Sequence, residues 1–157
     1  MGVAGAGKTT IGQLLANELG WPFLDADSLH PMANIEKMSQ GIPLTDADRT
    51  AWLAAIHNQI VESFQDSENL VVACSALKQK YRTELAKCVT IRWVYLKGSE
   101  ELIRSRLEHR DEHFMKAKML ASQVADLEEP TQAIIIDVRV TPDIAVRQIV
   151  NALNLNE

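Results

Sequence analysis

Hydrophobic and polar residues alternate along the chain with two different periods, and each change of period marks a new element. Between Lys8 and Leu19 apolar residues recur three and four positions apart, which predicts an amphipathic helix that ends at Gly20. The apolar run from Trp21 to Asp25 predicts a short strand. Further helices are expected at 34–40, 45–64, 76–86, 100–109, 115–127 and 142–153, and further strands at 70–74, 91–96 and 133–137.

Thr45 and Asp48 have the spacing of a capping box, in which a hydroxyl and an acid satisfy free backbone N–H groups at the start of a helix. This spacing predicts that the long helix opens at Thr45. Asp48 could instead contact a substrate, but helix capping is the favoured interpretation.

Helices and strands alternate along the chain, and the strands are apolar throughout. This order predicts an α/β fold in which a parallel sheet is covered by helices on both faces. Ligands of such folds bind at the carboxyl ends of the strands. A chain of 157 residues has room for one domain, 1–157.

The composition is that of a soluble globular domain, with 46% hydrophobic and 24% charged residues. The net charge of -5 and the isoelectric point near 5.4 argue against nucleic acid or an anionic membrane as a partner. No stretch approaches the roughly 20 apolar residues of a membrane span, and no signal peptide is recognisable. Cys74 and Cys88 have no metal-binding or redox spacing, so we expect reduced thiols in a cytoplasmic protein, with Cys74 in the core.

The strongest chemical signal is a phosphate-binding loop at the start of the sequence. Residues 2–9 fit the pattern GxxxxGK[ST] and lead directly into the first predicted helix. Glycines let the backbone turn its N–H groups around phosphate oxygens, while Lys8 is expected to reach the β- and γ-phosphates and Thr9 to bind Mg²⁺. The residues of this segment expected to hold ATP are Gly2, Gly5, Ala6, Gly7, Lys8, Thr9 and Thr10.

A phosphate-binding loop normally follows a buried strand, yet only Met1 precedes Gly2 here. In folds of this kind that strand is central, and two neighbouring strands would lose a hydrogen-bonding partner without it. We therefore expect that the sequence starts at an internal methionine and that an apolar strand of roughly eight to twelve residues belongs upstream.

Two acidic residues, Asp25 and Asp27, stand at the carboxyl end of the first predicted strand. Alternate residues of a strand share a face, so both carboxylates should point towards the phosphate-binding loop. Asp25 is expected to bind Mg²⁺, directly or through water, and Asp27 to accept the proton of an attacking hydroxyl or to orient that group. The alternative is that both acids cap the turn that follows.

Phosphate-binding loops also occur in GTPases and in motor-type ATPases. The NKxD motif of guanine specificity is absent from the sequence. Asp137 ends an apolar strand, as in a motor ATPase, but it lies late in the chain and has no second acid beside it, so a structural part is favoured. These observations favour a small-molecule kinase.

Blocks of sequence across nearly the whole chain resemble the gluconokinase family, in its order and with its spacing. They are residues 25–31 (DADSLHP), 34–38 (NIEKM), 41–49 (GIPLTDADR) with Trp52 and Leu53, 73–78 (ACSALK) with Tyr81 and Arg82, and Arg106, Leu107, Arg110, His113, Phe114, Met119, Leu120, Ser122, Gln123, Leu127 and Glu128. Val124 departs from the family, which commonly has phenylalanine there.

The resemblance implies transfer of the ATP γ-phosphate to the 6-hydroxyl of D-gluconate, giving 6-phospho-D-gluconate for the pentose phosphate pathway. It implies a fold similar to shikimate and nucleoside monophosphate kinases, with a substrate-binding region at 28–50 and a mobile lid at 106–128. D-gluconate is then the small-molecule partner, ATP and Mg²⁺ are the cofactors, and a homodimer is left open.

The resemblance also provides candidate substrate and lid residues. His30 is expected to face the sugar acid, although a lone histidine is more often structural. Arg49 and Arg82 are candidates for the substrate carboxylate, because a guanidinium binds it through two hydrogen bonds, but either could be a surface ion pair. Arg106 and Arg110 are expected to reach the ATP phosphates when the lid closes, the alternative being a solvated helix end. The expected catalytic residues are Lys8, Asp27 and Arg110.

Other interpretations stay open at this point. A related kinase could act on another polyol acid, on shikimate or on a nucleotide, and a nucleotide-binding module would bind ATP without catalysis. Ser75 could line the site or cap a helix, and Lys78 could lie near phosphate or in solvent. His109 and His113 lie four positions apart, but no third zinc ligand is evident, so a zinc site is not favoured.

Overall fold

The computed structural model describes residues 1–66, 68–108 and 113–153, with side chains in α6 described from Met119 onwards. The helices are α1 (Lys8–Leu19), α2 (Met32–Ser39), α3 (Asp46–Gln65), α4 (Gln79–Leu85), α5 (Glu100–Glu108), α6 (His113–Asp126) and α7 (Pro142–Leu153), with a 3-10 helix η1 (Ala26–Leu29). The strands are β1 (Phe23–Asp25), β2 (Val71–Ala73), β3 (Val94–Lys97) and β4 (Ile134–Asp137). The alternation of helices and strands expected from the sequence is confirmed.

The strands pair in parallel, as the apolar runs predicted. β1 pairs with β2, with Phe23 opposite Val71, and β3 pairs with β4, with Val94 opposite Ile134. Each pair runs in one direction, so the carboxyl ends of β1 and β2 lie at the same edge. That edge carries Asp25.

Backbone hydrogen bonds of the first two residues link the two strand pairs. The Met1 nitrogen donates to the Val94 carbonyl at 2.5 Å, and the Leu96 N–H donates to the Met1 carbonyl at 3.0 Å. The Gly2 N–H donates to the Ser75 carbonyl, just beyond β2, at 3.2 Å. Residues 1–2 therefore lie between β3 and the end of β2, where the phosphate-binding loop begins. The strand expected in front of this loop stays a prediction.

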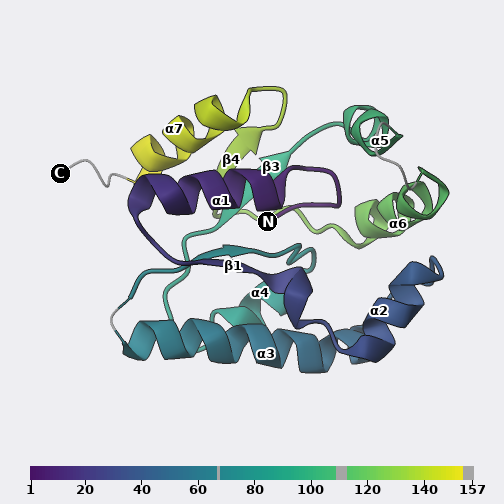
Figure 1. Ribbon diagram of the computed structural model, residues 1–157, viewed down its shortest axis with the longest axis horizontal. Helices are drawn as coiled ribbons and strands as arrows, with labels where there is room; N and C mark the ends of the chain where they lie inside the picture. The colour runs from purple at the N-terminus through teal and green to yellow at the C-terminus, as the bar shows by residue number, and fades with distance from the viewer. Residues whose placement is uncertain (67, 109–112, 154–157) are drawn as a thin grey trace.

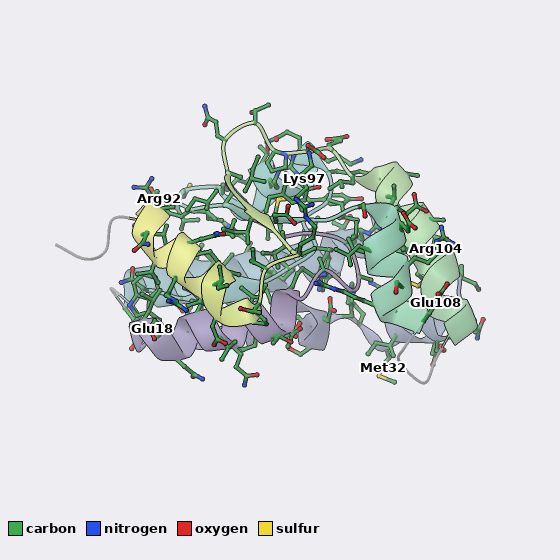
Figure 2. The ribbon with its side chains drawn as sticks, turned by 90° about the horizontal axis from the view of Figure 1, so that it is seen from above. Glu18, Met32, Arg92, Lys97, Arg104 and Glu108 are labelled. Carbon is green, nitrogen blue, oxygen red and sulfur yellow. The ribbon has the colours of Figure 1, made fainter. Side chains whose placement is uncertain are left out.

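Helices cover the strands from two sides. Figure 1 shows α1 and α7 on one side of the strands, α3 and α4 on the other, and α2, α5 and α6 gathered towards one end. In Figure 2, seen from above, α1 lies beside α7 and α5 beside α6. This arrangement confirms the predicted α/β fold with helices on both faces.

Three groups of buried side chains hold these layers together. One group joins α1 and α7 to β3 and β4 and includes Ile11, Leu15, Leu96, Ile136 and Ile149. A second lies under α3 and α4 and includes Trp52, Ile56, Cys74, Tyr81 and Leu85. The third joins the phosphate-binding loop to α5 and α6 and comprises Val3, Leu77, Ile103, Leu107 and Leu120, with Val124 and Leu127 packed against it. The valine at position 124 therefore keeps an apolar contact.

Several predicted bounds differ from the structure; the strand expected from residue 91, for example, begins at Val94. The helix expected from Ala76 begins three positions later, at Gln79, because Ala76 is fully buried in the left-handed conformation (φ 44°), which no helix continues. The sequence pattern also did not predict η1, directly after Asp25. The Asp25 carboxylate accepts a hydrogen bond from the Asp27 N–H at 3.1 Å and so caps this short helix.

The two cysteines are free thiols, as expected from their spacing. Cys74 is buried, and burial raises the pKa of its thiol to about 11, whereas Cys88 is exposed. Among the described residues no helix has the length and hydrophobicity needed to cross a membrane.

Candidate active site

The phosphate-binding loop wraps tightly before α1. Gly5 and Gly7 have φ values of 80° and 98°, a region that residues with a Cβ rarely adopt. A Cβ at Gly5 would lie 2.9 Å from the Leu107 side chain, so α5 also requires glycine here. Gly7 is the N-cap of α1 and offers no side chain to its first N–H groups. These groups are left for an anion such as phosphate.

The other loop residues expected to hold ATP fall into two groups. Gly2 and Ala6 are buried, and they contribute backbone to the loop. Thr9 and Thr10 are exposed in the first turn of α1.

Lys8 points back into the loop. Its Nζ donates to the Val3 carbonyl at 3.0 Å. Burial lowers the pKa of Lys8, while the negative charges of Asp27 and Asp25 raise it. The ammonium therefore lies close enough to both strand-end acids for their charges to act on it.

Asp25 lies directly beside the phosphate-binding loop. The Thr9 hydroxyl donates to one Asp25 carboxylate oxygen at 2.7 Å, and the other oxygen accepts the Asp27 N–H. Asp27 is exposed at the start of η1. The capping role considered for the two acids thus holds for Asp25, whereas the Asp27 carboxylate faces solvent near Lys8.

The residues at this edge suit Mg²⁺. Magnesium in phosphotransferases is usually held by one or two protein oxygens together with phosphates and water. The Thr9 hydroxyl and the Asp25 carboxylate provide such hard oxygen atoms within 2.7 Å of each other. Within the described part of the chain no group of three or more His, Cys, Asp or Glu residues could hold a metal alone.

His30 lies just beyond η1, and its surroundings orient its ring. The imidazole stacks on the Trp52 indole, and the Asn34 side-chain amide lies 3.3 Å from its Nδ1. The same amide donates to the Asp48 carbonyl at 2.8 Å. Burial lowers the pKa of His30, the charge of Asp27 raises it and that of Arg49 lowers it. His30 is therefore close enough to both the acid at the loop and the arginine on α3 for their charges to act on it.

The predicted capping box at the start of α3 is confirmed. Asp48 accepts from the Thr45 N–H at 2.8 Å and donates its own N–H to the Thr45 hydroxyl at 3.2 Å. Asp48 also pairs with Lys37 of α2 at 2.6 Å. Hydrogen bonds from Lys37 and Thr45 hold the pKa of Asp48 down at about 2.

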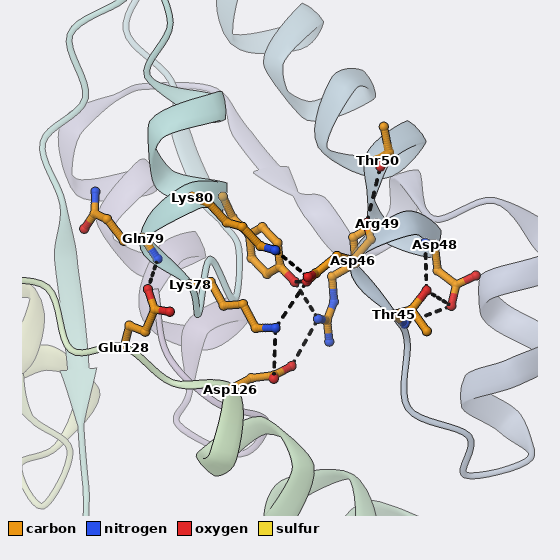
Figure 3. Close-up of polar contacts among 11 residues, drawn as sticks. Thr45, Asp46, Asp48, Arg49, Thr50, Lys78, Gln79, Lys80, Asp126 and Glu128 are labelled. Carbon is orange, nitrogen blue, oxygen red and sulfur yellow. Dashed lines mark hydrogen bonds and ion pairs between the residues drawn. The ribbon is translucent and has the colours of Figure 1, made fainter.

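Arg49, one of the two candidates for the substrate carboxylate, lies in a polar cluster between α3, α4 and α6 (Figure 3). Its Nη1 donates to the Tyr81 hydroxyl at 2.7 Å and to an Asp126 carboxylate oxygen at 3.1 Å. Lys78, for which the sequence left solvent or phosphate open, lies 3.2 Å from the other Asp126 oxygen. The structure thus brings two cations of the chain to one carboxylate.

Arg82, the other candidate, is in the protein interior. It is 3% exposed, and its guanidinium donates to the carbonyls of Ala76, Leu77 and Glu128 and to the Gln79 side chain at 2.9–3.0 Å. These bonds join the start of α4 to the segment after α6. This geometry gives Arg82 a structural part and does not favour its predicted binding of substrate.

The lid candidates can be placed only in part. Arg106 of α5 donates to the Val138 carbonyl, just beyond the carboxyl end of β4. Arg110 and His109 lie outside the described residues. In α6, the Gln123 side-chain oxygen accepts the Ala4 N–H of the phosphate-binding loop at 2.6 Å. α6 therefore touches the loop in this state.

A cavity of about 470 Å³ is lined in part by Arg82 and lies away from the phosphate-binding loop. Its walls include Trp93 and Ile134 at the amino ends of β3 and β4, and Leu153 at the end of α7. The phosphate-binding loop and the strand-end acids are at the opposite edge, so this cavity is not the candidate site.

Sequence reasoning gave no part to several residues that now flank the site. Trp52 and Gln123 stand in blocks that resemble a known family, which was the available signal. Asp126 carried no signal, because its contact with Arg49 joins residues 77 positions apart.

Comparison with known proteins agrees with this geometry. The sequence profile of the family described as "Shikimate kinase" matches residues 4–154. A gluconokinase of Gluconobacter oxydans is 48% identical over 131 residues, which cover 83% of this chain and 74% of that protein.

Two solved structures are also similar over nearly their full length. A gluconokinase from Sinorhizobium meliloti shares 41% identity with a TM-score of 0.89, and the match covers 98% of this chain and 89% of that one. An unliganded sugar kinase from Janibacter shares 38% identity with a TM-score of 0.92, covering 99% and 92%.

Proposed function

This chain belongs to the shikimate kinase family and, within it, to the gluconokinases, and from that membership we propose that it transfers the γ-phosphate of ATP to the 6-hydroxyl of D-gluconate. The observation that carries the proposal is the placement of Asp25 beside Thr9 and of Asp27 near Lys8, in a chain 48% identical to a gluconokinase. The product is 6-phospho-D-gluconate, with ADP released.

The proposed reaction assigns a separate task to each group at the loop. Asp27 accepts the proton of the 6-hydroxyl as its oxygen forms a bond to the γ-phosphorus, while the bond from that phosphorus to the β,γ-bridging oxygen breaks. Lys8 and the first N–H groups of α1 stabilise the negative charge of the phosphates. The exposed position of Asp27 and the nearby charge of Lys8 support this assignment.

Thr9 and Asp25 are the residues proposed to hold Mg²⁺. The ion would neutralise phosphate charge when it is bound with ATP. Without it, Asp25 keeps its hydrogen bonds from Thr9 and from the Asp27 N–H, so the acid is already oriented.

Substrate and lid residues complete the proposal. His30 and Arg49 are proposed to contact the sugar acid, with Asn34 and Trp52 holding His30 in place. Residues 106–128 are proposed as a lid whose arginines approach the phosphates on closure. Free thiols and the use of ATP support a cytoplasmic location.

The test is an ADP-release assay with Mg-ATP and D-gluconate, with shikimate and other polyol acids as alternative substrates. We expect turnover with D-gluconate and a loss of about 10²- to 10⁴-fold in kcat for Asp27→Asn. Asp137→Asn is the matched control, because it neutralises another strand-end acid, one that pairs with Arg139. Turnover with shikimate alone would contradict the proposed substrate, and unchanged kcat in Asp27→Asn would contradict the proposed base.

A further inference from the structure

The Asp126 carboxylate is bound by two cationic side chains, as the carboxylate of a bound substrate would be. Arg49 Nη1 lies 3.1 Å from Oδ2 of Asp126, and Lys78 Nζ lies 3.2 Å from its Oδ1 (Figure 3). The cations come from α3 and from the residue before α4, whereas the acid is the last residue of α6. Each oxygen of one carboxylate therefore has its own cation, from an element other than its own.

The two cations do not depend on Asp126 for their positions. Arg49 also donates to the Tyr81 hydroxyl and lies over the Tyr81 ring, 5.4 Å from its centroid. Lys78 also pairs with Asp46 at 3.2 Å. Both side chains are largely shielded, with 11% and 22% of their surface exposed. A site for a carboxylate would therefore persist if the Asp126 side chain turned away.

Charge in this cluster favours such an exchange. Asp46 accepts hydrogen bonds from Lys80, Tyr81 and Lys78, which hold the pKa of its carboxyl below its ordinary range. Asp46 is thus already supplied with cationic partners, and Lys80 contacts Asp46 without contacting Asp126. When Asp126 leaves, an unpaired positive charge remains for an incoming anion.

The cluster lies on the substrate side of the strand-end acids. Arg49 and Trp52 are three positions apart on α3, and Trp52 stacks on His30. His30 in turn follows η1, which begins beside Asp27. In a linear sugar acid the reacting hydroxyl and the carboxylate are at opposite ends, so the carboxylate must bind at a distance from Asp27. His30 is close enough to both Asp27 and Arg49 for their charges to act on it.

We propose that Arg49 and Lys78 form the subsite for the carboxylate of the sugar acid, and that Asp126 occupies this subsite until the substrate displaces its side chain. This inference rests on the proposed function and extends it to the group that selects acids over neutral sugars. Exchange requires no covalent step, because one carboxylate replaces another between the same cations. Substrate can bind only to molecules in which the Asp126 side chain has left the subsite. The apparent dissociation constant of the substrate is therefore the intrinsic one divided by the fraction of such molecules.

The test compares Asp126→Asn and Lys78→Met with the wild type. The readouts are the KM for D-gluconate, the KM for ATP, and the inhibition constant of D-gluconamide, which lacks the negative charge. Glu129→Gln is the matched control for Asp126→Asn, since it removes a surface acid that pairs with Lys97. Lys80→Met is the control for Lys78→Met. Asp126→Ser is used if Asp126→Asn lowers the melting temperature.

We expect Asp126→Asn to lower the KM for D-gluconate by about threefold or more, with the KM for ATP unchanged. We expect Lys78→Met to raise the KM for D-gluconate by about tenfold or more and to leave the inhibition constant of D-gluconamide unchanged. An unchanged or raised KM for D-gluconate in Asp126→Asn would overturn the proposal, as would equal losses for both ligands in Lys78→Met.

The wild-type assay separates this proposal from the proposed function. If the wild type phosphorylates another sugar acid instead of D-gluconate, the substrate assignment fails. The same variants are then measured with that acid and its amide. The subsite is judged from the change in the KM of the acid relative to the change in the inhibition constant of the amide.

Discussion

The imidazole of His30 stacks on the indole of Trp52, with ring centroids 4.3 Å apart and planes 10° from parallel. The indole N–H of the same tryptophan donates to the Ala26 carbonyl at 2.7 Å. Trp52 is 2% exposed and belongs to the core under α3. A single core side chain therefore fixes both the turn between the two strand-end acids and the histidine proposed to face substrate.

Replacing Trp52 by phenylalanine should weaken both stability and substrate binding. The Ala26 carbonyl would lose its buried donor, which should lower the free energy of unfolding by about 1–3 kcal/mol, and the KM for D-gluconate should rise. Urea denaturation and steady-state kinetics measure these effects. Trp21→Phe is the matched control, since Trp21 is only partly buried. Equal effects of the two substitutions would show that the indole N–H has no special part.

His30 should make the stability of the fold depend on pH. Burial lowers its pKa below the ordinary value of 6.5, so the unfolded chain binds a proton at pH values where the folded chain does not. The free energy of unfolding should therefore fall as the pH falls from about 6.5 towards the lower pKa of the folded state.

The difference between the wild type and His30→Gln isolates this effect. Denaturation between about pH 7.5 and about pH 5.5 should show a larger loss of stability in the wild type than in the variant. Parallel curves would mean that proton binding by His30 is not linked to folding.

Asp25→Asn should raise the concentration of Mg²⁺ needed for half-maximal activity by about 10- to 100-fold, because the variant loses a negative oxygen ligand beside Thr9. A titration of turnover with MgCl₂ at fixed ATP measures this shift. Ser28→Ala is the control, since the Ser28 hydroxyl donates to the Asp25 carbonyl in the same turn without adding a ligand. An unchanged Mg²⁺ requirement would remove Asp25 from the metal site.

Arg82→Lys tests the two parts considered for this arginine. If Arg82 is structural, the variant should lose about 2 kcal/mol or more of stability, because lysine cannot reach the same four oxygens, while the KM for D-gluconate stays near that of the wild type. Arg92→Lys, on an exposed arginine, should change stability by about 0.5 kcal/mol or less. A raised KM with unchanged stability would instead restore Arg82 to the substrate site.

Elements with clear end signals were predicted closely from the sequence. The predicted bounds of α1 and α7 agree with the structure, because Gly20 ends the first in a left-handed conformation and Pro142 opens the second. The start of α3 followed from the capping box of Thr45 and Asp48. In each case the signal is local, so tertiary contacts are not needed to interpret it.

The start of α4 could not be predicted in this way. Alanine favours helices, but Ala76 takes a positive φ because it is enclosed on all sides between the end of β2 and the core. Propensity gave the wrong start because packing decided the backbone conformation at this position.

In the candidate site, too, features with a local sequence signal could be predicted, whereas features that depend on tertiary packing could not. The closeness of Asp25 to Thr9 followed from the rule that loops and strand ends share one edge of the sheet. The placement of Arg82 and the pairing of Arg49 with Asp126 depend on how α4 and α6 pack, which one sequence does not reveal. The sequence showed that positions 49 and 82 carry cationic side chains, but it did not show which groups those side chains contact.

The bonds around Glu128 define a pivot for α6. Its N–H donates to the Leu77 carbonyl at 2.9 Å, its carbonyl accepts from Arg82 at 2.9 Å, and its carboxylate accepts the Gln79 N–H at 2.6 Å. α6 has 14 residues, so a rotation of about 20° about this point would carry its far end through about 7 Å and Asp126 through only about 1 Å. In such a rotation α6 would act as a lever arm whose short end is at Arg49. If α6 moves as part of the proposed lid, such a rotation would move the far end of the helix while the contacts of Asp126 with Arg49 and Lys78 stay almost in place.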